Sequence, residues 1–180
     1  MKTFFLRTAV VWAMLITINL SISAQTMALS VKHQSLSAIA AWEAKGNMSG
    51  LGQAIHEGLD HGLTVSQIKE ALSQLYAYTG FPRSLNALGQ LQKVMAERTA
   101  DGRPVPLGHD DERVVPPSFD ALKTGTEVQT KLSGAPFNYT FAPRTDYYLK
   151  SHLFGDIFAG TALTPAEREI VTVSAISALP

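Results

Sequence analysis

A histidine and a carboxylate spaced four residues apart offer the first candidate chemistry in this sequence. His56 and Asp60 fall on one face of a predicted helix, because residues i and i+4 are neighbours on a helix surface. A carboxylate there can orient an imidazole, which titrates near neutral pH and serves as a general acid or base. The alternative is a surface His–Asp pair. His61 lies about 140° further round the helix, so it suits the helix end better than a metal site shared with His56.

Two other side chains are candidates for binding an anionic substrate. Arg83 follows a proline in the first turn of a predicted helix, where its guanidinium and the free backbone N–H groups both suit a carboxylate. Tyr78 can donate its hydroxyl into a pocket. Tyr76 points about 200° away from Tyr78 on a helix, so one of the two belongs to the core. The alternatives are a solvated arginine and a core tyrosine.

The composition excludes several kinds of chemistry. The sequence has no cysteine, which removes disulfides, thiol catalysis and thiolate metal sites. No histidine and carboxylate residues have metal-ligand spacing, and no glycine-rich phosphate loop is present, so we expect neither a metal nor another cofactor. The formal net charge of zero gives no indication of a nucleic-acid partner.

The first 24 residues have the pattern of a signal peptide. Lys2 and Arg7 precede an apolar run over residues 8–20, and small residues suit cleavage after Ala24. This run is shorter than the roughly twenty residues that span a bilayer. We therefore predict a periplasmic or secreted protein, with an uncleaved membrane anchor as the alternative.

The elements that position the candidate residues are predicted to be helices. Apolar residues have helical spacing over about 30–45, 49–61, 64–76 and 82–98. Ser49 is the predicted N-cap of the second helix, Gly62 suits the position after its end, and Thr64 opens a capping box on the third. In the fourth helix the residues predicted to face inward are Leu85, Leu88, Leu91 and Met95.

The second half of the chain begins with an irregular segment. Residues 100–117 are rich in proline and glycine and are predicted to be a surface linker. Helices are predicted over 118–132 and 144–159, and Thr164 opens a second capping box on a helix that reaches 178 through Ile170, Val173 and Ile176. No segment alternates with a strand period, so the predicted fold class is all-α.

A faint internal repeat relates residues 29–41 to 163–175. Both copies begin with leucine and a hydroxyl residue and continue into an alanine-containing helix, although two unrelated helix starts are the alternative. A repeat buries its apolar face on a neighbour. The last helix is therefore expected to pack on the first unit, on another subunit, or on residues beyond this sequence.

Several motifs follow His56 in a characteristic order. They are Gly62-Leu63-Thr64, Ile68-Lys69-Glu70, Tyr76-Ala77-Tyr78-Thr79-Gly80-Phe81-Pro82 and Asn86-Ala87-Leu88. This order is similar to the core of carboxymuconolactone decarboxylase family domains, and the likeness covers residues 29–97. A second patch resembles the opening of the same domain type, with Phe154-Gly155-Asp156-Ile157-Phe158, Leu163-Thr164 and Arg168-Glu169-Ile170. The predicted organisation is thus a signal peptide at 1–24, a domain at 29–99, a linker with a short helix at 100–142 and a partial second unit at 143–180.

The resemblance implies a helical bundle of the carboxymuconolactone decarboxylase and alkyl hydroperoxidase D type, which commonly forms rings of protomers. It implies that His56 is the family's histidine and that Glu169 belongs to an Arg-Glu pair whose glutamate can face it. Ser35 occupies the aligned position of the first unit, so Glu169 would have to reach His56 across the repeat or between subunits. The family's thiol peroxidases use a cysteine pair, matched here by Ser49 and Gly52, and a sulfur relay needs sulfur.

We therefore predict a cofactor-free decarboxylase of a small carboxylated lactone or related acid. His56 would donate the proton, Arg83 would anchor the carboxylate, Tyr78 would bind substrate and Glu169 would assist His56. The alternative is a non-catalytic helical binding or assembly module that keeps the fold. The expected partners are a small carboxylate and further copies of the chain.

Overall fold

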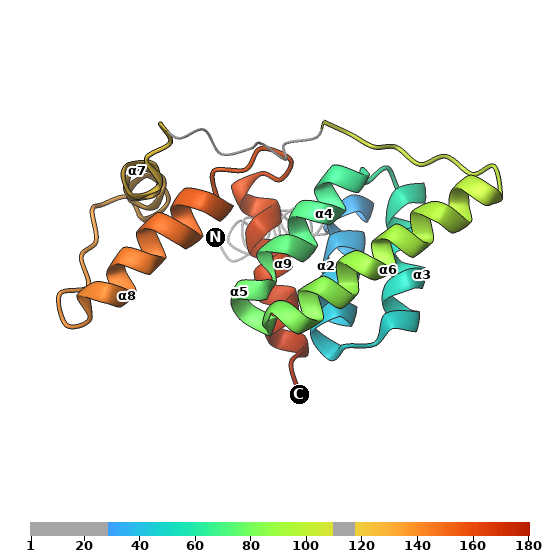
Figure 1. Ribbon diagram of the computed structural model, residues 1–180, viewed down its shortest axis with the longest axis horizontal. Helices are drawn as coiled ribbons and strands as arrows, with labels where there is room; N and C mark the ends of the chain where they lie inside the picture. Colours follow the sequence, from blue (N-terminus) through green and yellow to red (C-terminus); the bar gives the residue numbers. More distant parts are fainter. Residues whose placement is uncertain (1–28, 110–117) are drawn as a thin grey trace, which may run out of the picture. The chain divides into compact units, whose positions relative to one another are not determined.

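The computed structural model describes residues 29–109 and 118–180. Within these ranges the regular structure is helical and includes no strand, which confirms the all-α class (Figure 1). None of the helices in this part of the chain is long and apolar enough to cross a bilayer. The predicted signal peptide at 1–24 lies outside the described residues.

The first described range forms a helical bundle around one apolar core. Its helices are α2 (Val31–Lys45), α3 (Met48–Asp60), α4 (Val65–Gln74), α5 (Tyr76–Thr79) and α6 (Phe81–Ala100). Helix α2 packs against α3, and both α3 and α4 pack against α6. The fully buried side chains at the centre are Leu36, Ile39, Leu51, Ile55, Leu63, Ile68, Leu72 and Leu75.

The two ends of α3 are determined by local hydrogen bonds. Asn47, and not the predicted Ser49, is the N-cap, because its Oδ1 accepts the N–H of the third helical residue at 2.9 Å. Gly62 follows the helix with a φ of +87°, as predicted for the position after its end. The Leu63 N–H then donates to the Gly58 carbonyl at 2.9 Å, and the buried Leu63 side chain holds the corner between α3 and α4.

Helix α4 begins as predicted, and three of the four residues predicted to face inward on α6 do so, since Leu91 is buried and Leu88 and Met95 pack against the core. The capping box of Thr64 and Gln67 is present. Leu85, which was predicted to face inward, is 62% exposed. Ser84 is buried instead and donates its hydroxyl to the Leu72 carbonyl at 2.8 Å. The buried residues of α6 are Ser84, Ala87, Leu91, Val94 and Arg98.

The irregular segment after α6 is attached to the start of α4. The carbonyls of Pro106 and Leu107 accept the backbone N–H groups of Val65 and Ser66 at 2.8 and 3.0 Å. These are N–H groups of the first helical turn, which lack partners inside the helix. Part of the predicted linker therefore caps α4 in place of water.

Helices α7 (Ala121–Ser133), α8 (Pro143–Tyr148) and η1 (Leu149–Ile157) match the two helices predicted over 118–132 and 144–159. The second of these continues from α8 into η1, which is a π-helix. Helices α7 and η1 approach so closely at Gly125 and Gly155 that a Cβ on either glycine would overlap the backbone of the other helix. Long π-helices are uncommon and often occur at functional sites.

Helix α9 (Pro165–Ala178) begins with the predicted capping box of Thr164 and Glu167. It packs along α2, so the two copies of the faint repeat lie against each other within one chain. Its buried face contains Val171, Thr172 and Ala175, whereas Val173 and Ile176 are 59% and 51% exposed.

Candidate functional site

The imidazole of His56 lies on α3 between a carboxylate and a guanidinium. Its Nε2 is 3.4 Å from Glu97 Oε2, and its Nδ1 is 3.2 Å from Arg103 Nη1. A guanidinium can only donate, so Nδ1 accepts and the proton of a neutral ring is assigned to Nε2, facing Glu97. The side chain is 25% exposed. His56 is therefore oriented by its neighbours, but these are not the partners that were predicted.

The predicted pairing of Asp60 with His56 is wrong. The Asp60 carboxylate binds Arg98 Nη2 at 2.8 Å and Arg103 Nη2 at 2.7 Å. Hydrogen bonding from Arg98 is the main cause that lowers the pKa of Asp60, and His56 makes the smallest contribution. The buried Arg98 also donates to the carbonyls of His56 and Pro104. Two cations satisfy Asp60 better than one imidazole can, so Asp60 joins α3 to the end of α6.

His61 lies at the end of α3, as predicted. Its Nδ1 is 2.9 Å from the hydroxyl of Ser35 on α2. Ser35, which the sequence resemblance aligned with a glutamate, is thus the partner of His61. The pair joins α2 to α3.

Arg83 lies in the first turn of α6, near enough to a carboxylate of its own chain to act on its pKa. Its charge acts on the fully buried Glu43 of α2. Glu43 Oε1 accepts the Thr79 hydroxyl at 2.7 Å. Burial raises the pKa of Glu43, while Thr79 and Arg83 oppose this rise. The predicted carboxylate anchor therefore acts on the charge of a carboxylate of its own chain.

Tyr78 and Glu169 are the two predicted site residues that lie near each other. Tyr78 is half-buried on α5 and hydrogen-bonds to Thr172 of α9, and the exposed Glu169 lies close enough to act on its charge. Burial is the main cause that raises the pKa of Tyr78, and Glu169 adds to it. Helix α2 packs against both α3 and α9. The predicted residues thus occupy three places: His56 with Glu97, Arg83 with Glu43, and Tyr78 with Glu169.

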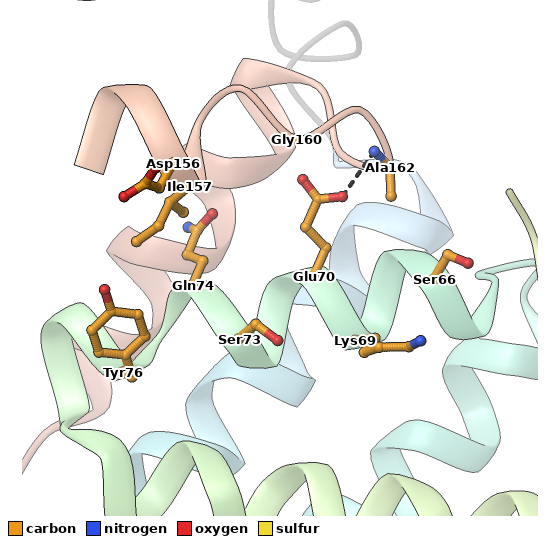
Figure 2. Close-up of a pocket in the computed structure, with 10 residues that line it drawn as sticks. All are labelled: Ser66, Lys69, Glu70, Ser73, Gln74, Tyr76, Asp156, Ile157, Gly160 and Ala162. Atoms are coloured by element: carbon orange, nitrogen blue, oxygen red, sulfur yellow. Dashed lines mark hydrogen bonds between the residues drawn. The ribbon is translucent and has the colours of Figure 1, made fainter. Parts of the chain in front are cut away.

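A cavity of about 280 Å³ lies elsewhere, on the face of α4 that meets the end of η1 and the following loop (Figure 2). Its lining includes none of the four predicted site residues. It is formed by Ser66, Lys69, Glu70, Ser73, Gln74, Tyr76, Asp156, Ile157, Gly160 and Ala162. This cavity is the candidate functional site, because its concave surface is lined by charged side chains of both signs, Lys69, Glu70 and Asp156.

One wall of the cavity is a buried polar network. The Arg168 guanidinium forms an ion pair with Glu70 and donates to the carbonyl of Gly160 at 2.9 Å and to Gln74 Oε1 at 3.2 Å. Gln74 donates back to the Arg168 carbonyl at 2.9 Å, and Glu70 Oε2 accepts the Ala162 N–H at 2.8 Å (Figure 2). Burial lowers the pKa of Arg168 to about 10, so the guanidinium stays charged at neutral pH.

One end of the cavity carries a tyrosine and an Asp–His pair. The Tyr76 ring stacks on Phe81 at 4.2 Å and lies 5.6 Å from the ring of His152. Its hydroxyl is buried and has no hydrogen-bond partner among the described residues. His152 Nδ1 is 2.8 Å from Asp156 Oδ2. An unpaired buried hydroxyl is costly.

A second cavity, of about 490 Å³, lies on the other side of α4, toward α6. It shares Ser66, Lys69 and Ser73 with the first cavity, but most of its remaining lining is apolar: Val65, Leu88, Leu91, Met95 and Leu107. It contains no acidic side chain. The first cavity is therefore the better candidate for a specific polar ligand.

No model of a known protein family matches the chain, and no curated protein matches it. Among the described residues, no group of three histidine or acidic side chains is placed to hold a metal ion. The sequence contained partial signals for the cavity. Glu70 and Arg168 lie within motifs of the family resemblance, and His152 and Asp156 have the same four-residue spacing as His56 and Asp60.

Proposed function

We propose that this chain is a helical binding module with a carboxymuconolactone decarboxylase-type fold, which takes a small polar molecule into the cavity between α4 and η1. The observation that carries the proposal is the cavity itself, which has charged groups on its walls and an unpaired buried hydroxyl. The predicted acid–base residues do not line it. The family resemblance of residues 29–97 supports the choice of fold.

The test of this proposal is ligand-dependent stabilisation that requires an open cavity. A ligand present at one hundred times its Kd stabilises the folded state by about 2.7 kcal/mol, which raises the Tm of a domain of this size by roughly 5–11 °C. A panel of small acids, amines and amino acids would be screened by thermal unfolding. The replacement Ala162→Leu fills the cavity and should abolish the shift, whereas Ala166→Leu on the exposed start of α9 should keep it.

The second candidate function is cofactor-free decarboxylation of a small carboxylated lactone. The observation that favours it is the orientation of His56 by Glu97 and Arg103. In this reaction the bond to the carboxylate breaks, carbon dioxide leaves, the conjugated carbonyl takes up the electron pair, and His56 returns a proton to carbon. Carbon dioxide release from 4-carboxymuconolactone that is lost in His56→Ala would establish it. If the folded protein releases no carbon dioxide, the binding module remains the proposed function.

We also propose that the chain forms a homo-oligomer and is exported. Val173 and Ile176 leave an apolar strip on the exposed face of α9, and light scattering with Ile176→Asp would test whether this strip joins copies. Export rests on the sequence pattern of residues 1–24. N-terminal sequencing of the mature protein should begin at Gln25.

A further inference from the structure

The loop of residues 134–142 between α7 and α8, which we call the aromatic loop, carries three exposed aromatic side chains (Figure 1). They are Phe137, Tyr139 and Phe141, and the centroids of successive rings lie 6.3 and 6.2 Å apart. Phe141 is 88% exposed. Two more exposed tyrosines, Tyr147 and Tyr148, follow on α8. Exposed apolar side chains that gather in this way mark an interaction site.

A buried ion pair holds the aromatic loop in place. Lys150 Nζ donates to Asn138 Oδ1 at 2.7 Å and to Asp146 Oδ2 at 2.6 Å, and its side chain is 6% exposed. Asp146 Oδ1 accepts the backbone N–H of Tyr139 at 3.0 Å. The rings are therefore displayed on a fixed backbone, so binding requires little further ordering of the loop.

The exposed charges next to the aromatic loop are positive. Between residues 131 and 149 the only acidic residue is Asp146, and its buried lysine partner balances its charge. Lys131 and Arg144 precede and follow the loop, and both are exposed. Further along α7, the exposed Lys123 and Glu127 carry opposite charges. The loop therefore suits an anionic partner, and exposed basic residues are attracted to an anionic bilayer.

The ring geometry and the charge favour a lipid bilayer over two other occupants. A sugar chain stacks on rings that share a plane, whereas the Tyr139 and Phe141 planes are 52° apart. A second copy in a two-fold dimer would place the same basic residues opposite each other, because such an interface pairs one surface with itself. At a bilayer interface the rings need no common plane, and tyrosine hydroxyls can reach water or headgroups.

The backbone of the aromatic loop suits a shallow position in a bilayer. Backbone polar groups without partners are costly in hydrocarbon. The N–H of Tyr139 donates to Asp146, and those of Thr140 and Ala142 donate to carbonyls within the loop. These groups can therefore leave water without losing their hydrogen bonds, and the rings can enter the boundary between headgroups and acyl chains.

We infer that the aromatic loop is a docking site for an anionic lipid bilayer, with Phe137, Tyr139 and Phe141 inserted at the interface and Lys131 and Arg144 at the headgroups. Binding of this kind depends on both the apolar area that is buried and the attraction between charges. The inference is independent of the cavity and its ligand, because none of these five residues lines it.

Vesicle co-sedimentation tests the inference. The protein that starts at Gln25 is used, so that the apolar run over residues 8–20 cannot bind vesicles itself, and circular dichroism checks that each variant is helical. Vesicles of phosphatidylcholine with one-third phosphatidylglycerol should bind it at least about fivefold more tightly than pure phosphatidylcholine vesicles. Phe141→Ser should weaken binding about tenfold or more. Arg144→Gln should weaken binding to the anionic vesicles about fivefold.

Matched controls come from exposed residues of α6. Leu85→Ser and Lys93→Gln change side chains that are 62% and 66% exposed, and both should leave binding unchanged. A tryptophan reporter gives a second measurement. In Phe141→Trp, brominated lipids should quench the added fluorescence, whereas in Leu85→Trp they should not.

Several outcomes would overturn the inference. One is a folded protein that does not bind the anionic vesicles. Another is an equal loss of binding in Phe141→Ser and Leu85→Ser, because the aromatic loop would then not be the site. Equal binding to both kinds of vesicle contradicts the anionic assignment. If light scattering shows a dimer that Phe141→Ser dissociates, and the wild type binds no vesicles, the occupant is a second copy.

Discussion

Replacing Glu70 by glutamine removes the charge that balances buried Arg168 while it keeps the shape of the side chain. The Arg168 side chain is 1% exposed, and that of Glu70 is 16% exposed. In Glu70→Gln the guanidinium keeps the neutral acceptors Gly160 O and Gln74 Oε1. It loses its only charged partner among the described residues. The variant therefore contains a buried cation without a counter-charge.

The expected loss of stability follows from this burial. Breaking a buried ion pair by removal of one partner costs about 3–5 kcal/mol. Glu70 is partly exposed, so water can reach the site and the loss should fall at the lower end, about 3 kcal/mol. For a domain of this size the Tm should fall by roughly 6–12 °C. The double variant Glu70→Leu with Arg168→Met should be less destabilised than the sum of the single changes, with a coupling of about 1–3 kcal/mol.

Urea unfolding followed by circular dichroism measures these free energies. The matched control is Glu97→Gln, since Glu97 is 46% exposed and, among the described residues, pairs with His56 and Lys93 at the surface. This control should change the free energy of unfolding by about 0.5 kcal/mol or less. A loss in Glu70→Gln no larger than that of the control, or additive effects in the double variant, would refute the reasoning about the buried pair.

Three further predictions concern the packing, charge and ends of the helices. Gly160→Ala places a Cβ against Glu70 and Arg168 and should cost about 1–3 kcal/mol of stability. In Gly89→Ala the added Cβ meets no atom within 4 Å, so this variant should stabilise α6 by about 0.5–1 kcal/mol. Urea unfolding measures both changes. The raised pKa of Glu43 means that the folded protein holds a proton which the unfolded chain releases, so this contribution to stability is present below the unfolded pKa and is lost as pH rises through the folded value. As pH rises from about 4 to 7, the free energy of unfolding of Glu43→Gln should therefore increase relative to that of the wild type. A difference between the two that stays constant with pH contradicts this. Thr64→Ala removes the side-chain cap of α4 and should cost about 1 kcal/mol by the same measurement.

The sequence by itself determined the elements that depend on neighbouring residues. Both capping boxes, at Thr64 and Thr164, were predicted and are present. The glycine after α3 was also predicted, because glycine just past the end of a helical run adopts a left-handed φ without steric cost. Caps and helical periods depend on groups within four residues of each other, so the order of residues is sufficient to find them.

The faces of the helices were decided by tertiary contacts. Leu85 and Ser84 differ by one position, and the hydrogen bond of Ser84 to a carbonyl of α4 determines which of them is buried. Asp60 was assigned to His56 because they are four residues apart, yet it binds Arg98 and Arg103, about forty residues away. Long-range cations compete with local partners, and the local spacing contains no information about them.

The candidate site is entirely a product of the tertiary structure. Gln74 and Arg168 are 94 residues apart, and the ion pair of Arg168 with Glu70 forms only because α9 packs along α2 and brings the preceding loop over α4. The sequence supplied the charged residues and the helices that carry them. Which of these charges lose their water and meet in one cavity depends on how the helices pack, because burial is a property of the assembled core.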